Sequence, residues 1–188
     1  MNKFTMTGSD QSNPTEIVAF WRAVGSERWF EKDTALDEEI HRRFLKLHED
    51  AAAGKLVAWE RNAEGALALL ILLDQFPRNM FRGDKRAFAT DPLAREVASR
   101  AILNGFDGAI SDMRGFFYLP FKHSENLADQ QRAVTLFKAA GDADGVKWAE
   151  LHADIIRRFG RFPHRNAVLG RVTTPEEQAF LDAGGFAG

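Results

Sequence analysis

Hydrophobic residues recur every three or four positions along most of the chain, which is the spacing of one face of an α-helix. The clearest stripe lies between Asp33, a residue suited to cap a helix start, and Gly54, a residue suited to end one. Its members follow one another in steps of four, four, three and four: Leu36, Ile40, Phe44, Leu47 and Ala51. The pattern therefore predicts an amphipathic helix of about 20 residues.

Two further helices are predicted on either side of this one. Asn13 followed by Pro14 indicates a helix start, and this helix is expected to run to about Val24. Asn62 can cap a helix that is apolar on every side, which is typical of the middle of a helix bundle. Pro77 is predicted to end it, because the residue before a proline avoids the helical conformation.

The second half of the chain carries four more helix patterns. Their predicted spans are 91–104, 124–140, 144–159 and 174–181. Ser124 is the predicted cap of the second, and Trp148, Leu151 and Ile155 mark the stripe of the third. Residues 174–177 form a complete capping box for the last. The aromatic stretch 115–121 is expected to be an extended, buried connector, since no partner strand lies nearby.

Alanine and leucine far outnumber valine and isoleucine, a balance that favours helix over sheet. We therefore predict an all-α protein of about seven helices in antiparallel helix pairs, because the connecting loops are short. The predicted organisation is a flexible segment over residues 1–13, a single helical domain over 14–183 and a frayed tail over 184–188.

The composition argues against several classes of protein. A chain of 188 residues with 45% hydrophobic residues can form a full core, and its net charge of -2 argues against nucleic-acid binding. The absence of cysteine excludes disulfides, thiol catalysis and cysteine-based zinc sites. The longest apolar run, 66–73, is too short to span a membrane, and the first residues do not form a secretory signal. We therefore expect a cytoplasmic protein without a membrane partner.

Familiar catalytic motifs are absent, so the sequence identifies neither a reaction nor a cofactor, and it leaves open whether the protein is an enzyme. Polar chemistry instead concentrates in three segments that border apolar ones: residues 74–79, 122–125 and 157–171. Asp74 in the first segment directly follows an apolar run and is expected to be partly buried. A structural ion pair with an arginine is the favoured interpretation, and a functional carboxylate is the alternative.

The second segment contains the strongest candidates for proton transfer. Ser124 suits a helix cap and Glu125 suits a first helical turn, but His123 has no such structural reason. A histidine with a carboxylate two positions on could perform acid–base chemistry. The candidate catalytic residues are therefore His123, Glu125 and, in the third segment, His164.

The third segment, from Arg157 to Arg171, contains five arginines and no acidic residue. Forked guanidinium donors could bind a phosphate or a carboxylate. Alternatively, Arg157 and Arg158 stabilise a helix C-terminus and the other arginines pair with acidic residues elsewhere. His152, just before this segment, is expected to face the core, where a satisfied core histidine is the favoured interpretation over a ligand.

One short element occurs twice in the chain. The letters FPRN stand at 76–79, after the third predicted helix, and FPHRN stands at 162–166, after the sixth. Two predicted helix ends therefore share the same aromatic, proline and Arg-Asn chemistry.

Three long blocks of the sequence resemble a bacterial family of unknown function, the domain of unknown function family 924. The blocks are LALLILLDQFPRNMFRGDKRAFATDPLA, FFYLPFKHSENLADQQRAV and LHADIIRRFGRFPHRNAVLGR. The resemblance covers nearly the whole chain after about Glu16, and implies an all-helical, tetratricopeptide-like fold with no established activity. The recurring elements of the family match residues 74–79, 89–91, 123–125, 152 and 161–166.

The leading hypothesis is a helical protein with one polar pocket that binds a small anionic ligand and can transfer protons. Its predicted ligand-binding residues are Asp74, Arg78, His123, Glu125, His152, Arg161, His164 and Arg165. One alternative is a tetratricopeptide-like scaffold that binds a peptide segment. The other is a metal-dependent hydrolase using the histidines and Glu125, but no pair of them has the spacing of a helical metal motif, so no metal site is predicted.

Overall fold

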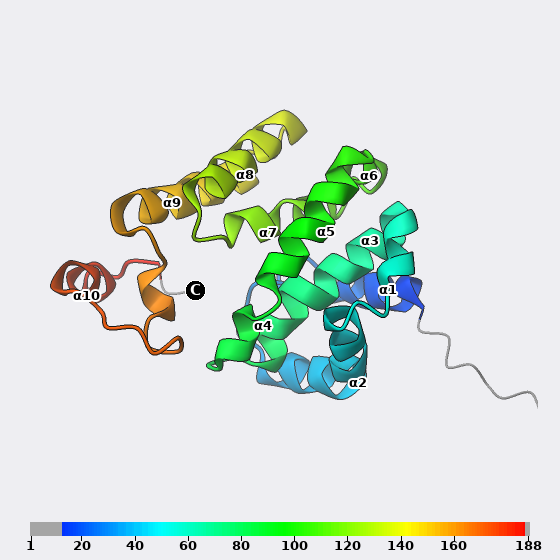
Figure 1. Ribbon diagram of the computed structural model, residues 1–188, viewed down its shortest axis with the longest axis horizontal. Helices are drawn as coiled ribbons and strands as arrows, with labels where there is room; N and C mark the ends of the chain where they lie inside the picture. Colours follow the sequence, from blue (N-terminus) through cyan, green and yellow to red (C-terminus); the bar gives the residue numbers. More distant parts are fainter. Residues whose placement is uncertain (1–12, 187–188) are drawn as a thin grey trace, which may run out of the picture.

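The computed structural model describes residues 13–186, so residues 1–12 of the predicted flexible segment and residues 187–188 lie outside the described part. Every regular element within 13–186 is helical and no strand occurs there, which confirms the all-α prediction (Figure 1). The α-helices are α1 (Pro14–Val24), α2 (Thr34–Ala52), α3 (Ala63–Leu70), α4 (Phe76–Met80), α5 (Asp91–Leu103), α6 (Phe106–Ala109), α7 (Leu119–Lys122), α8 (Leu127–Ala140), α9 (Ala143–Phe159) and α10 (Pro175–Asp182). Single helical turns of other types cover Val57–Arg61, Ile71–Gln75, Lys85–Phe88, Arg114–Phe117 and Pro163–Arg165.

Polar side chains cap several helices where the sequence predicts them. Asn13 accepts a hydrogen bond from the backbone at the start of α1, and Asp33 does so at the start of α2. Thr174 and Glu177 make both bonds of the predicted capping box at α10. These predictions are confirmed.

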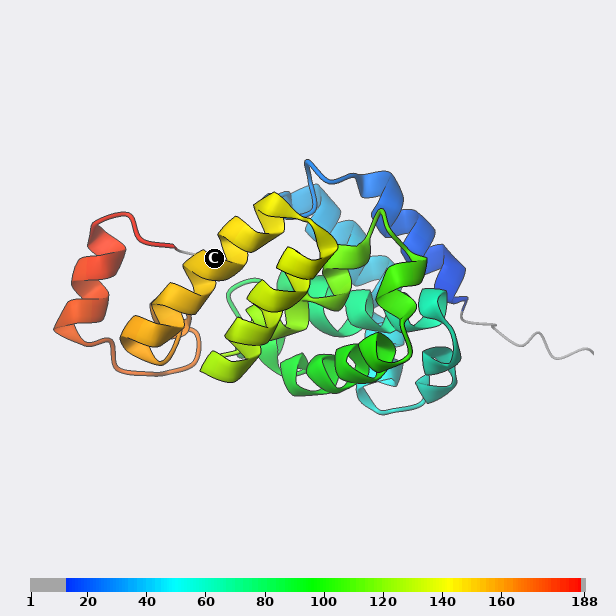
Figure 2. The same cartoon turned by 90° about the horizontal axis from the view of Figure 1, so that it is seen from above.

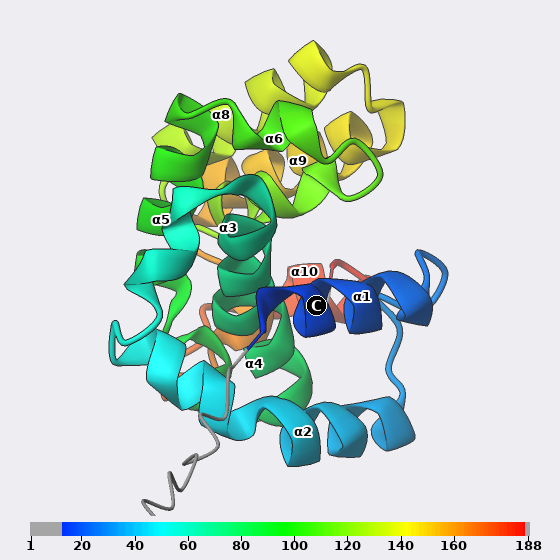
Figure 3. The ribbon, with the colours of Figure 1, turned by 90° about the vertical axis from the view of Figure 1, so that its right-hand side faces the viewer.

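Helix α3 lies in the interior of the molecule, as its all-round apolar sequence predicts. Every residue from Gly65 to Leu70 is buried. The helix packs against α1 on one side and α5 on another (Figure 3). The residues that follow α3 therefore emerge deep inside the protein, which places the polar segment 74–79 there.

The prediction that Pro77 ends this helical segment is wrong. The backbone widens into a π turn over Ile71–Gln75 and then continues as α4, with Pro77 as its second residue. A proline nitrogen cannot donate the hydrogen bond that a continuous α-helix requires, and a π turn accommodates that interruption. The chain therefore passes through the proline without leaving the interior.

Two side chains contact carbonyl groups of the π turn, where Pro77 has no N–H to donate. The hydroxyl of Thr90 donates to the carbonyl of Leu73 at 2.6 Å. The Nδ1 atom of His48 lies 2.9 Å from the carbonyl of Leu72. Because buried carbonyls need hydrogen-bond donors, these contacts stabilise the π turn.

The aromatic stretch 115–121 is buried, as predicted, but it is helical and not extended. It forms the 3-10 turn Arg114–Phe117 followed by α7. In the absence of a partner strand within 13–186, local contacts satisfy its buried backbone groups. The amide of Tyr118, for example, donates to the carbonyl of Gly115 at 2.8 Å.

Helix α8 begins later than predicted, because Asn126 is its cap and Ser124 is not. Asn126 accepts hydrogen bonds from two backbone amides of the first turn. The Ser124 hydroxyl instead donates to Asp129 at 2.7 Å. Glu125 therefore lies before the helix, not in its first turn, and its carboxylate contacts another segment.

The predicted stripe of α9 is only partly buried. Ile155 is buried, whereas Trp148 and Leu151 are exposed. The buried face of α9 contains His152 together with small and β-branched residues, so the prediction that His152 faces inward is confirmed. The exposed tryptophan shows that hydrophobic spacing alone did not identify which face of α9 packs.

Helices α8 and α9 pack side by side as an antiparallel pair (Figure 2). Beyond them, α10 lies at one end of the molecule (Figures 1 and 2). A small second core there contains Ile155, Ile156 and Phe162, with Phe186 of the predicted frayed tail packed against it.

The tetratricopeptide-like arrangement, and the peptide groove it would imply, stay predictions. Within residues 13–186, no helix combines the length and apolar character needed to cross a membrane.

Candidate functional site

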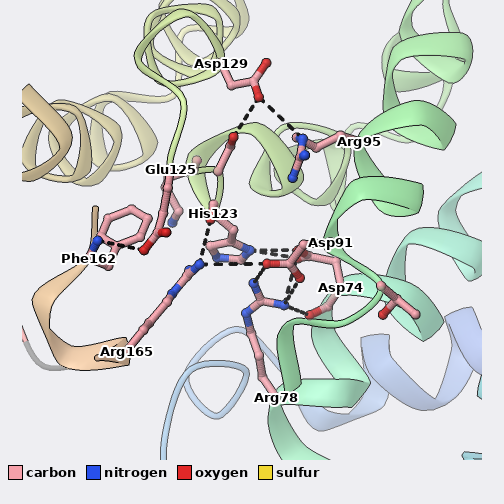
Figure 4. Close-up of polar contacts among 12 residues, drawn as sticks. Asp74, Arg78, Asp91, Arg95, His123, Glu125, Asp129, Phe162 and Arg165 are labelled. Carbon is pink, nitrogen blue, oxygen red and sulfur yellow. Dashed lines mark hydrogen bonds and ion pairs between the residues drawn. The ribbon is translucent and has the colours of Figure 1, made fainter. Parts of the chain in front are cut away.

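A buried carboxylate–imidazole pair lies where the interior helices meet. Asp74, in the π turn, is 1% exposed, and His123 directly follows α7 beside it (Figure 4). The Nδ1 atom of His123 lies 2.9 Å and 3.0 Å from the two carboxylate oxygens of Asp74. The side-chain amide of Gln75 donates to the same carboxylate. The two members of the pair are 49 positions apart, so only the fold brings them together.

Asp74 is ionised and His123 is neutral near neutral pH. Burial opposes the charge on Asp74, but the Arg78 guanidinium and the His123 ring outweigh burial and hold the pKa of Asp74 below its usual range. Burial lowers the pKa of His123 to about 3. The single ring proton is then on Nδ1, which donates to Asp74, and Nε2 is an acceptor. No group within 13–186 bonds Nε2, and the His123 side chain is 12% exposed.

Arg78, from α4, compensates the negative charge of the buried carboxylates of Asp74 and Asp91. Its Nη1 and Nη2 atoms donate to the two oxygens of Asp91 at 3.1 Å and 3.0 Å, and Nη1 lies 3.4 Å from a carboxylate oxygen of Asp74. Arg78 also donates to the backbone carbonyl of Asp74. Burial raises the pKa of Asp91 despite its contact with Arg78. One arginine therefore holds two buried acids in place, as the structural ion-pair interpretation of Asp74 predicted.

Arg165 approaches the same cluster from a later segment of the chain, the loop after α9. It is 7% exposed, and its guanidinium carbon lies 4.6 Å from the ring centre of Phe88 and 4.5 Å from that of Phe162. Its Nη1 atom donates to the carbonyl of His123 at 3.0 Å and lies 3.9 Å from Asp91. Its buried Nε atom has no hydrogen-bond partner within the described residues. Arg165 is therefore firmly placed, and one of its donors is unused.

Glu125 does not join His123, although the two are close in sequence. Its carboxylate accepts from both Nη atoms of Arg171, at 2.7 Å and 3.0 Å, and from the backbone amide of Phe162 at 2.8 Å. Burial opposes its charge, but the contacts with Arg171 and with the Phe162 amide together outweigh burial and lower the pKa of Glu125. Glu125 therefore holds the loop that carries Arg165, and a direct catalytic role does not follow from its position.

Arg161 also has a structural partner away from the cluster. Its guanidinium pairs with Glu177 of α10, with Nε at 2.6 Å and Nη2 at 2.9 Å from the carboxylate. This contact lowers the pKa of Glu177 to about 2. Asn166 donates to the same carboxylate at 3.0 Å. These bonds hold α10 against the loop over 160–171.

His152 and His164 lie next to the cluster, on its aromatic side. Their rings are 5.5 Å and 5.6 Å from the ring of Phe162, and both contact Phe186. Burial lowers the pKa of His152 to about 3 and that of His164 to about 4, so both rings are neutral. His152 donates from Nδ1 to the carbonyl of Trp148 at 2.8 Å, as a satisfied core histidine does. The buried Nδ1 of His164 has no partner within 13–186.

Lys122, the residue before His123, adds a positive charge that the sequence-based candidate list did not include. Its ammonium lies 5.8 Å from the ring of Phe30, and no carboxylate of the described residues is within ion-pair distance. Burial lowers its pKa to about 8, so the side chain is still mostly protonated at pH 7. The clue in the sequence was its place next to a buried aromatic stretch.

Of the predicted site residues, Asp74, Arg78, His123 and Arg165 share one cluster. Asp91 belongs to it as well, but the sequence analysis interpreted this residue only as a helix start. The signal was present, because residues 89–91 match an element of the family pattern.

Among the residues that the structure describes, no group of three or more histidine or acidic side chains lies close enough together to hold a metal ion. The predicted ligands of the metal-dependent alternative point to different partners instead, with Glu125 bound to Arg171 and His152 to a backbone carbonyl. Two shallow surface hollows lie elsewhere, one beside Asp37 and Asn79 and one between α1 and α2. Neither hollow is lined by His123 or Arg165.

Comparison with known proteins confirms the resemblance inferred from the sequence. The family described as "Bacterial protein of unknown function (DUF924)" matches residues 17–185. The chain is also similar to a solved structure, the protein of unknown function ATU0120 from Agrobacterium tumefaciens. The two are 51% identical with a TM-score of 0.88, over 91% of this chain and 97% of that chain. No curated protein matches. The function must therefore be argued from the site itself.

Proposed function

We propose that this chain, which belongs to the DUF924 family of bacterial proteins of unknown function, binds a small anion beside a proton-transfer pair formed by His123 and Asp74. One observation carries the proposal: two unused polar atoms occur in neighbouring groups. Nε2 of His123 can accept a proton, and Nε of buried Arg165 can donate to an anion. Arg165 donates to the backbone carbonyl of His123, so the two residues are neighbours.

Each residue of the cluster has a distinct role in this proposal. Asp74 fixes the tautomer and the orientation of His123, as a carboxylate does in a catalytic triad. Arg78 keeps Asp74 ionised and joins it to Asp91. Arg165 supplies the positive charge and the donor for the ligand. Glu125 acts indirectly, because it holds in place the loop that carries Arg165.

Ligand binding is expected to change the basicity of His123. Burial makes the neutral ring a weak base, with a pKa of about 3. An anion placed near the ring stabilises the protonated form and raises the pKa of His123. A general base works best when its pKa is near the ambient pH. The pair would therefore become an effective proton acceptor only when its ligand is bound.

The experiment is a titration of the intact protein, labelled with nitrogen-15 in its histidine rings, with sodium acetate, sodium sulfate and inorganic phosphate. The ring signals of His123 are followed by NMR. We expect at least one of these anions to shift them in a saturable way. His123→Gln identifies the signals, and His41→Gln, in a histidine on the distant helix α2, is the matched control.

A flat response of His123 to all three anions would contradict the proposal. A saturable response of another histidine, with His123 unchanged, would contradict it as well, since the binding site would then lie elsewhere.

A further inference from the structure

We propose that the exposed face of α9 pairs with the same face of a second molecule of this chain, with the two helices antiparallel and Leu151 at the two-fold axis. The proposal is independent of the anion site. It follows from three features of α9: an exposed apolar pair, an order of charges that complements itself when the helix is reversed, and charges that have no strong partner within the chain.

The apolar pair consists of Trp148 and Leu151, which are 47% and 37% exposed. They are three positions apart on one helix, so they are neighbours on its surface. The buried face of α9 contains Ala149, His152 and Ile156, and the α8–α9 pair lies at the edge of the molecule (Figures 1 and 3). Tryptophan is enriched in protein interfaces and is often their strongest contact, so this pair is suited to meet a partner.

Four exposed charged side chains continue the same face on both sides of Leu151. They are Asp144, Lys147, Asp154 and Arg158, and with Leu151 they follow one another in steps of three, four, three and four. Along the helix the order is negative, positive, apolar, negative, positive.

This order of charges selects an antiparallel arrangement. When a second molecule runs in the opposite direction with Leu151 facing itself, Asp144 lies opposite Arg158 of the partner subunit, and Lys147 lies opposite Asp154 of the partner subunit. Parallel helices would place each charge opposite itself, and like charges across an interface are unfavourable. A two-fold dimer uses the same surface on both molecules, as this pattern requires.

The same charges have weak partners or none within the chain. Asp144 and Lys147 take part in no ion pair among residues 13–186. Asp154 has only exposed partners on its own helix, Arg157 at 3.0 Å and Arg158 at 3.9 Å. Exposed pairs of this kind contribute little to stability, so the charges of this face are available to a second molecule.

The position of Arg158 is fixed by two aromatic rings. Its guanidinium carbon lies 4.9 Å from the ring centre of Phe159 and 5.2 Å from that of Phe180. The side chain nevertheless stays 51% exposed. A charged group that is already held in place loses little conformational entropy when it pairs, which favours its contact with Asp144 of the partner subunit.

A cross-linking experiment tests the position of the two-fold axis. The chain contains no cysteine, so Leu151→Cys introduces a single thiol at the proposed axis. A disulfide requires Cα atoms within about 7 Å of each other, which residues facing each other across the axis can satisfy. Leu103→Cys, at a leucine of α5 that is 84% exposed, is the matched control. We expect mild oxidation to cross-link Leu151→Cys about tenfold faster or more than the control. Equal rates would overturn the proposal.

Analytical ultracentrifugation of the intact chain tests the pairing of charges. We expect a reversible equilibrium between the 21.1 kDa monomer and a dimer, because the apolar part of the face is small. Asp144→Arg and Arg158→Asp are each expected to weaken dimerisation by about tenfold or more, and the double variant to restore it to within about threefold. Leu103→Asp is the matched control and is expected to leave dimerisation unchanged. Circular dichroism establishes that each variant is folded.

Each outcome decides for or against the proposal. Loss of dimer in the single charge reversals and its recovery in the double variant support it. A wild-type chain that stays monomeric at millimolar concentration overturns it. A dimer that both single reversals leave unweakened lies on another face, which also overturns it. Weakening in the single variants without recovery in the double variant overturns the antiparallel register.

Discussion

The two copies of the Phe-Pro-…-Arg-Asn element, at 76–79 and 162–166, reach the same cluster from two distant segments of the chain (Figure 4). Each begins with a fully buried phenylalanine, and each delivers an arginine toward Asp91. The arginines differ in their partners. Arg78 contacts Asp74 and forms a double hydrogen bond with Asp91, whereas Arg165 has one backbone acceptor and an unused donor.

The comparison teaches that the same local sequence can place an arginine that is fully paired in one location and an arginine with an unused donor in another. The difference comes from what surrounds the element. The first copy meets two buried carboxylates, and the second meets phenylalanine rings and neutral histidines. Arg165 lies 3.9 Å from Asp91 and makes no double hydrogen bond with it, so more of its donors are left for a ligand than in Arg78.

The largest expected effect comes from removing the arginine of the first copy. Arg78→Ala leaves Asp74 and Asp91 buried without their main partner, which is expected to reduce the free energy of unfolding by about 3–5 kcal/mol. Arg165→Ala leaves no such buried carboxylate pair and is expected to reduce it by about 1–2 kcal/mol. Urea denaturation of both variants measures the difference. Equal losses would contradict the contrast between the two copies.

The histidines that pack on Phe162 of the second copy are expected to make the protein sensitive to acid. The folded-state pKa values of His152 and His164, about 3 and 4, lie below the ordinary value of 6.5. Between those values and 6.5, the unfolded chain binds protons that the folded chain does not, so stability is lost as the pH falls from about 6.5 to 4. We expect a loss of about 3 kcal/mol or more across this window.

Urea denaturation at several pH values from 7 to 4.5 checks this expectation. His152→Gln is expected to flatten the dependence, because it removes one of the groups whose pKa is lowered by burial. Stability that is constant over the window would show that the histidines titrate in the folded state as they do in the unfolded chain.

The loop that carries the second copy depends on Glu125. Glu125→Ala removes the contacts with Arg171 and the Phe162 amide and is expected to destabilise the protein by about 1–2 kcal/mol. Hydrogen exchange of the Phe162 amide should accelerate, while exchange in α3 should stay slow. Glu150→Ala, which breaks an exposed ion pair with Lys138, is the matched control. Equal acceleration in α3 would indicate general destabilisation and contradict a local role.

A similarly small effect is expected at the π turn that precedes the first copy. Thr90→Val keeps the shape of the side chain but removes the donor to the Leu73 carbonyl, and is expected to cost about 1–2 kcal/mol. Thr135→Val removes an exposed hydroxyl bond in α8 and is expected to change stability by less than about 0.5 kcal/mol. Thermal unfolding compares the two variants. Similar values would show that the buried carbonyl does not need Thr90.

Much of the fold could be predicted from the sequence, because caps and hydrophobic spacing act locally. Asn13, Asp33 and the capping box at Thr174 all behave as expected. The prediction at Pro77 was wrong because His48 and Thr90, which contact carbonyls of the π turn, come from other segments. Rules based on local sequence cannot account for hydrogen-bond donors that come from distant segments.

The candidate site shows the same division between local and distant information. Asp74, Arg78, His123 and Arg165 were predicted because each borders an apolar run. Glu125 was assigned to His123 by proximity in sequence, whereas its partner Arg171 is 46 positions away. The acidic partner that completes the cluster, Asp91, had a sufficient local explanation as a helix start and was missed for that reason.

The central claim is that the ring of His123 is neutral, donates from Nδ1 to Asp74 and leaves Nε2 without a hydrogen-bond partner among residues 13–186. The nitrogen-15 chemical shifts of its two ring nitrogens at pH 7 test this claim most directly. We predict that Nδ1 has the shift of a protonated nitrogen and Nε2 that of an unprotonated one, with no change down to pH 5. A ring protonated on both nitrogens at pH 7, or on Nε2 alone, would contradict the account.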